Sequence, residues 1–137
     1  ARYEIKLDEY AKLINIEALT MIEMAKRSIA PAVSEYCRDL ANTALAKKEL
    51  GVNIKAEKDV LDKISDLAAV LNDKIAILEE AELKADEFEM LEKANYFHDE
   101  VIPKMNELRL ICDELETMTS ADYWPFPGYG ELLFSVK

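Results

Sequence analysis

Residues 14–44 read INIEALTMIEMAKRSIAPAVSEYCRDLANTA, and this stretch decides the fold. Its apolar residues recur every three or four positions, which is the spacing of one face of an α-helix. The series consists of Ile14, Ala18, Ile22, Ala25, Ile29, Val33, Tyr36, Leu40 and Ala44. It predicts one long helix that starts near Glu4 and stops before Gly51, because glycine suits the position just after a helix.

The same periodicity returns twice beyond Gly51 and predicts two more helices, at about residues 57–85 and 87–119. Short connections between successive helices favour antiparallel neighbours. We therefore expect an all-α fold, in which helices at about 4–50, 57–85 and 87–119 form an up-down-up bundle within a helical domain 1–121. The first helix would be on the order of 70 Å long, so its N-terminal third is expected to project from the bundle.

Two prolines, Pro31 and Pro103, lie inside the first and third helical patterns. A proline inside a helix removes one backbone hydrogen bond and clashes with the preceding turn. It can therefore either kink the helix or break it in two. The apolar periodicity resumes on both sides of each proline. We therefore expect kinks, and a Pro-kinked first helix in particular.

The composition supports helices and excludes several classes of partner. Only 3 Gly and 4 Pro interrupt 137 residues, a balance typical of long helices. The net charge of −11, without a basic cluster, argues against nucleic acid and anionic membrane as partners. No apolar run is long enough to span a bilayer, no signal peptide precedes the helices, and the chain starts at Ala1. We expect a cytoplasmic fragment or processed product.

The last residues, 122–137, differ sharply in composition from the helices. The string DYWPFPGYGELLF at 122–134 alternates aromatic residues with prolines and glycines, which predicts an extended aromatic docking tail. Its expected contact residues are Tyr123, Trp124, Phe126, Tyr129, Leu132 and Phe134. The tail could pack on the helices of this chain or on another domain or subunit, and the sequence leaves both open.

Residue types that carry chemistry are scarce. His98 is the single histidine, and Cys37 and Cys112 have no zinc or redox spacing, so both are expected to be reduced thiols in or near the core. His98 itself is expected to be a partly buried residue on a helix surface. The 3 glycines match no phosphate-binding loop. We therefore expect no catalytic residue, no cofactor-binding residue and no metal ligand in this chain.

The remaining possibility is a ligand groove lined by aromatic and methionine side chains, although at helical spacing these are more often core residues. They are Met21, Met24, Tyr36, Phe88, Phe97 and Met105.

Several strings resemble the C-terminal end of type III glutamine synthetases. They are ARYEIKL at 1–7, NIEALTM at 15–21, IAPAV at 29–33, DYWPFP at 122–127 and YGELLF at 129–134. The tail is the most specific of these strings, whereas residues 52–100 match only in their acidic helical character.

The resemblance implies a parent ligase of nitrogen metabolism that condenses glutamate with ammonia, using ATP and Mg or Mn. It implies a dodecameric homo-oligomer, in which this chain would be a non-catalytic C-terminal domain with a structural or assembly role. Its partners would be the upstream catalytic domain and neighbouring subunits. The alternative is a free-standing helical scaffold or adaptor that offers a groove to a partner protein.

Overall fold

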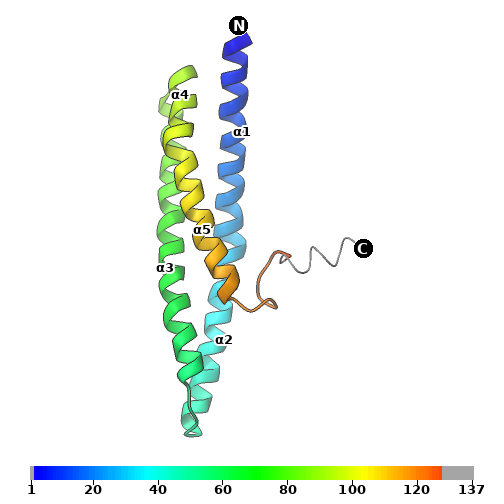
Figure 1. Cartoon of the computed structure of the whole chain (residues 1–137), viewed down its shortest axis with the longest axis vertical. Helices are drawn as coiled ribbons and strands as arrows, with labels where there is room; N and C mark the ends of the chain where they lie inside the picture. The colour runs from blue at the N-terminus through cyan, green and yellow to red at the C-terminus, as the bar shows by residue number, and fades with distance from the viewer. Residues whose placement is uncertain (1, 128–137) are drawn as a thin grey trace, which may run out of the picture.

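Three long helical segments lie side by side in the computed structural model, which describes residues 2–127 (Figure 1). The first segment consists of α1 (Arg2–Met24), the π-helical turn η1 (Ala25–Ile29) and α2 (Ala30–Glu49). The second is α3 (Lys55–Lys84). The third consists of α4 (Met90–Tyr96), the π-helical turn η3 (Phe97–Val101) and α5 (Ile102–Met118). Residues 2–127 contain no strand, so the predicted all-α, up-down-up bundle is confirmed.

Each proline is the second residue after a π-helical turn. The amide of Ala30 donates to the carbonyl of Ala25, and the amide of Ile102 donates to that of Phe97, so each bond spans five residues instead of four. The wider turn shifts the carbonyls that a proline ring would otherwise meet in a regular α-helix. The helices therefore continue through Pro31 and Pro103 without a break.

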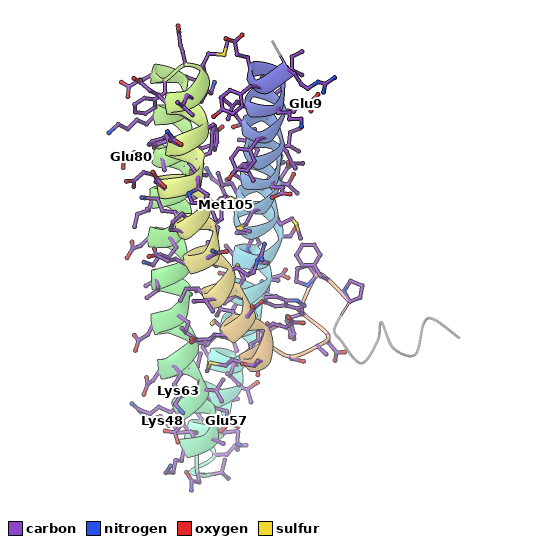
Figure 2. The ribbon with its side chains drawn as sticks, turned by 45° about the horizontal axis from the view of Figure 1, so that its top comes forward. Glu9, Lys48, Glu57, Lys63, Glu80 and Met105 are labelled. Atoms are coloured by element: carbon purple, nitrogen blue, oxygen red, sulfur yellow. The ribbon has the colours of Figure 1, made fainter. Side chains whose placement is uncertain are left out.

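Gly51 ends α2 as the sequence predicts. Its φ of 76° lies in the left-handed region, its amide donates to Lys48, and the amide of Val52 donates to Lys47. This pair of bonds is the Schellman arrangement, which satisfies carbonyls at a helix C-terminus. The Lys47 ammonium also lies 2.6 Å from Glu57 at the start of α3, and Figure 2 labels Glu57 at this end of the bundle. The hairpin between α2 and α3 is thus fixed by backbone and side-chain contacts.

The third helical segment starts later than the predicted residue 87. A short 3-10 turn η2 (Ala85–Glu87) ends α3, and Phe88 and Glu89 are extended before α4 begins at Met90. The ring of Phe88 stacks on Tyr96 with 4.8 Å between the centroids, and the Tyr96 hydroxyl donates to the Ala81 carbonyl. The third helical segment therefore begins three residues later than predicted, after two extended residues.

The N-terminal third of the first helix does not project, contrary to the prediction. Ala11 and Ile14 are buried, and Ala11 lines a small hollow together with Asp86 and Lys93. The turn between α3 and α4 therefore reaches almost to the start of α1, as Figure 1 shows, and only residues 2–9 remain largely exposed. At the opposite end α5 stops at Met118, and α2 and α3 continue there as a two-helix end.

Candidate functional site: a docked aromatic segment and an apolar groove

The chain after α5 folds into a tight turn around Ser120. The amides of Tyr123 and Trp124 both donate to the Ser120 carbonyl, at 2.9 and 3.1 Å. The Asp122 amide lies 3.4 Å from the Ser120 hydroxyl. Because serine can replace backbone partners in this way, the turn reverses the chain as soon as the helix ends. The residues that follow are thereby directed back to the bundle.

Tyr123 attaches this segment to α2. Its hydroxyl donates a 2.6 Å hydrogen bond to the Asp39 carboxylate, and its ring lies 5.2 Å from that of Tyr36, centroid to centroid. Asp39 also accepts a hydrogen bond from Arg38 at 3.1 Å. The charge-assisted hydrogen bond joins residues 84 positions apart in the chain, and the tilted aromatic pair adds specificity to the same contact.

The contact between Tyr123 and Asp39 changes the acidity of both groups. The hydrogen bond from Tyr123 lowers the pKa of Asp39 below its ordinary value of 3.8, because it stabilises the carboxylate. The same bond raises the pKa of Tyr123 above 10.0, because the phenol loses its acceptor's stabilisation when it ionises. Both shifts favour the bonded state at neutral pH.

The predicted contact residues divide into two sets. Trp124 and Phe126 are half-buried and pack against the hydrophobic core of this chain, beside Tyr123. The described part of the tail thus lies on its own helices, one of the two arrangements that the sequence left open. Tyr129, Leu132 and Phe134 lie outside the described residues. A contact of the tail with another domain or subunit remains a prediction.

An apolar groove runs between α1 and α5 and has a volume of about 460 Å³. Its wall on the first segment includes Ile16, Thr20, Met21, Met24 and Ile29, and its wall on α5 includes Met105 and Cys112. Met105 is labelled in Figure 2 on α5, where that helix passes α1. Two charged residues, Glu17 and Arg109, complete the lining. Because the lining is mostly apolar, the groove suits apolar side chains better than a polar substrate.

The groove changes the interpretation of the methionines. Phe97 and Met105 are buried, as expected for core residues. Met24, in contrast, is 40% exposed at the rim of the groove, and Met21 is only partly buried. Their helical spacing could not distinguish a core residue from a residue that lines a groove. Residues three positions apart can lie at the centre or at the edge of the same helix face.

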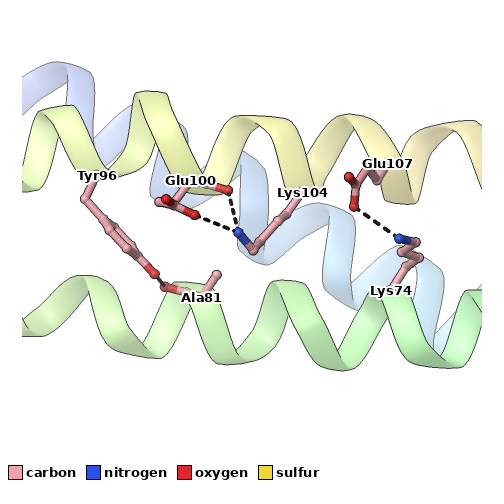
Figure 3. A network of polar contacts seen from close by, with 6 residues as sticks. All are labelled: Lys74, Ala81, Tyr96, Glu100, Lys104 and Glu107. Carbon is pink, nitrogen blue, oxygen red and sulfur yellow. Dashed lines mark hydrogen bonds and ion pairs between the residues drawn. The ribbon is translucent and has the colours of Figure 1, made fainter.

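Polar contacts join α3 to the third helical segment along one seam (Figure 3). The Tyr96 hydroxyl donates to the Ala81 carbonyl at 2.6 Å, and Lys74 lies 3.2 Å from Glu107. Lys104 approaches Glu100, four residues earlier on the same segment, at 2.9 Å. The contacts of Tyr96 with Ala81 and of Lys74 with Glu107 therefore join α3 to the third helical segment.

Neither cysteine takes part in a disulfide, and both are partly buried against the core, as predicted. Burial raises the pKa of Cys112 to about 11, and burial also raises that of Cys37. Both thiols are therefore protonated and weakly nucleophilic at neutral pH.

His98 is exposed and lies 2.9 Å from Asp99, its neighbour in the chain, so the expectation of a partly buried histidine is wrong. η3 turns this side chain outward while it keeps Phe97 and Val101 in the core.

Among residues 2–127, no group of three His, Cys, Asp or Glu side chains could hold a metal ion. No helix in the described part of the chain is long and apolar enough to cross a membrane.

The fold and these surfaces define a class of protein: an elongated all-α domain with a packed C-terminal segment and an apolar groove. Comparison with known proteins gives the family. The glutamine synthetase C-terminal domain family matches residues 1–48. The chain is 36% identical to a glutamine synthetase of Butyrivibrio fibrisolvens over 140 positions, which cover 100% of the chain and 20% of that relative. The chain therefore belongs to the family of glutamine synthetase C-terminal domains.

Two further relatives agree with this assignment. A type-3 glutamine synthetase of Dictyostelium discoideum is 28% identical over 98% of the chain and 19% of its own length. A glutamine synthetase of Bacteroides fragilis is 27% identical over the same shares. No solved structure matches the chain. The chain spans about a fifth of the length of the curated relatives it matches.

Proposed function

We propose that this chain is the non-catalytic C-terminal helical domain of a type III glutamine synthetase and has a structural role in the assembled enzyme. One observation carries the proposal: the match to the Butyrivibrio fibrisolvens glutamine synthetase covers the whole chain but a fifth of that relative. The type-3 relative from Dictyostelium discoideum and the tail string at 122–134 support the finer assignment.

The proposed parent reaction is the ATP-dependent condensation of glutamate and ammonia to glutamine. In this proposal the ATP and the Mg or Mn that the resemblance implies bind outside residues 2–127. Residues 2–127 offer no cluster of metal ligands. Gly51 ends a helix, whereas the glycine-rich loops that bind phosphate precede the N-terminus of one. No catalytic step is therefore assigned here, and the proposed partners are the catalytic domain and neighbouring subunits of a homo-oligomer such as the implied dodecamer.

A chimeric enzyme tests the proposal. This chain would replace the matching fifth of the Butyrivibrio fibrisolvens glutamine synthetase, and glutamine formation from glutamate, ammonia and ATP would be measured. We expect the chimera to form more glutamine and larger assemblies than the enzyme truncated before that fifth. The isolated chain should show no turnover.

Two outcomes would contradict this function. Turnover by the isolated chain would mean that a catalytic site lies within it. A chimera as inactive and unassembled as the truncated enzyme would favour the free-standing scaffold or adaptor. Size-exclusion chromatography with light scattering gives the mass of each assembly.

A further inference from the structure

The outer face of α1 exposes an unusual number of large apolar side chains. Ile5 is 59% exposed, Leu13 55%, Ile16 61%, Leu19 47% and Met24 40%. Single exposed apolar residues are normal on a protein surface, whereas several within a few turns of one helix are typical of an interaction surface. These five residues are called the outer face of α1 below.

The geometry of α1 shows that this face lies outside the core of the chain. Ala18 is fully buried, and Ile16, two positions earlier, lies about 200° around the helix from it. Between Leu13 and Met21 only Glu17 is charged. Ion pairs lie on either side of this stretch, Lys12 with Asp8 before it and Arg27 with Glu23 after it.

The groove continues the outer face toward α5. Ile16 and Met24 belong to both surfaces, and Met105 extends the apolar lining across to the third helical segment. Arg109 lies in the lining and makes no ion pair with another residue of 2–127. The combined surface would therefore complement an apolar partner that presents a carboxylate.

Two observations indicate which partner covers this surface. The family match at residues 1–48 contains the whole of α1, so this helix belongs to the part that the family defines. The relatives are about five times longer than this chain, so most of each relative lies outside the matched region.

We propose that the outer face of α1 and the adjoining groove dock on the catalytic part of the glutamine synthetase polypeptide, through apolar side chains and a carboxylate that meets Arg109. The inference rests on the proposed function and assigns its contact surface. It places the main interdomain contact on α1 instead of on the aromatic tail.

Methionine oxidation tests this docking directly. Met24 lies at the rim of the groove, and Met90, which is 59% exposed on α4, serves as the reference. Hydrogen peroxide converts each accessible methionine to its sulfoxide, and peptide mass spectrometry gives the two rates. We expect Met24 to oxidise several-fold more slowly, relative to Met90, in the assembled chimera than in the isolated chain.

Two substitutions at equally exposed apolar residues supply the matched control. Ile16→Glu places a charge at the centre of the outer face, and Leu45→Glu places one on α2, where Leu45 is 64% exposed. We expect Ile16→Glu to restore the oxidation of Met24 and to weaken the assembly of the chimera, and Leu45→Glu to do neither. Arg109→Glu should act like Ile16→Glu. Thermal unfolding of the isolated variants, followed by circular dichroism, confirms that each remains folded.

Three results would overturn the inference. Met24 could oxidise equally fast in the isolated chain and in an active, assembled chimera. Its rate in the isolated chain could rise when residues 128–137 are removed, which would make the chain's own C-terminal segment the occupant. The oxidation rate of Met24 could also fall as the concentration of the isolated chain increases, which would indicate that a second copy of this chain covers the surface. A chimera that fails to assemble contradicts the proposed function itself and is distinguished by its mass.

Discussion

The Tyr123 hydroxyl and the Asp39 carboxylate join the segment after α5 to α2 through one hydrogen bond. Trp124 follows directly and is the single tryptophan of the chain. Because Trp124 packs against the core, its fluorescence reports whether the segment is docked. The chain thus carries its own probe for this contact.

The contact between Tyr123 and Asp39 should depend on pH at both extremes. The pKa of Asp39 is lowered, so the stability that its carboxylate gives to this contact is complete above pH 3.8. That stability is lost as the pH falls through the lowered pKa. The pKa of Tyr123 is raised, so the stability that its hydroxyl gives to this contact is complete below pH 10.0. That stability is lost as the pH rises through the raised pKa. We expect the Trp124 emission to shift to longer wavelength in both windows.

Tyr123→Phe is the control for this titration, because it keeps the ring and removes the donor. Its Trp124 emission should already be red-shifted at neutral pH and should change less in both windows. Identical titrations of the two proteins would exclude the hydrogen bond as the cause.

A second residue-scale prediction concerns the core. Leu78 is completely buried, and its neighbour Ile77 is 39% exposed. Leu78→Ala should lower the free energy of unfolding by about 2–5 kcal/mol, because it removes buried methyl groups and leaves a cavity. Ile77→Ala should lower it by less than about 1 kcal/mol. Urea unfolding measures both, and equal losses would contradict the packing described here.

Gly51 allows a prediction about the hairpin. No heavy atom lies within 4 Å of a Cβ added there, so the effect of a substitution comes from its φ of 76° alone. Gly51→Ala should cost about 1 kcal/mol of unfolding free energy. Gly51→Asn should cost less, since asparagine tolerates the left-handed region. A loss with Ala no greater than with Asn, measured by urea unfolding, would show that the turn changes its conformation.

At the scale of the helices, the π-helical turns explain how Pro31 and Pro103 fit into continuous helices. Pro31→Ala should change the unfolding free energy by less than about 1 kcal/mol, because the clash is already relieved by η1. Ala41→Pro, in regular α-helix, should cost about 3 kcal/mol or more. Chemical denaturation gives both values. A large gain from Pro31→Ala would show that the proline strains the helix.

The helices and the end of α2 could be predicted from the sequence, because periodic apolar residues and Gly51 act locally. The π-helical turns could not, since one extra residue in a turn hardly alters a spacing of three and four. The groove was foreseen only as an alternative for the methionines. Its form depends on how far α5 separates from α1, and this distance is set by tertiary packing that the periodicity of either helix does not contain.

At the scale of the whole molecule, the bundle has a three-helix part and a two-helix end. The core residues of α3 are Ile64, Leu71, Ile75, Leu78 and Ala81, and none precedes Ile64. The described segment around Tyr123 reaches α2 near Tyr36, and the hairpin beyond it has only two helices to bury its apolar side chains.

This asymmetry should appear as a gradient of hydrogen exchange along one uninterrupted helix. The amides of residues 58–63 are expected to exchange through local opening, and those of residues 71–78 only through opening of the three-helix part. Exchange followed by nuclear magnetic resonance would resolve the two rates within α3, and a uniform rate would mean that the bundle opens as a single unit. If residues 58–63 exchange faster, the two-helix end is the region that unfolds first under denaturant, while the three-helix part keeps its structure.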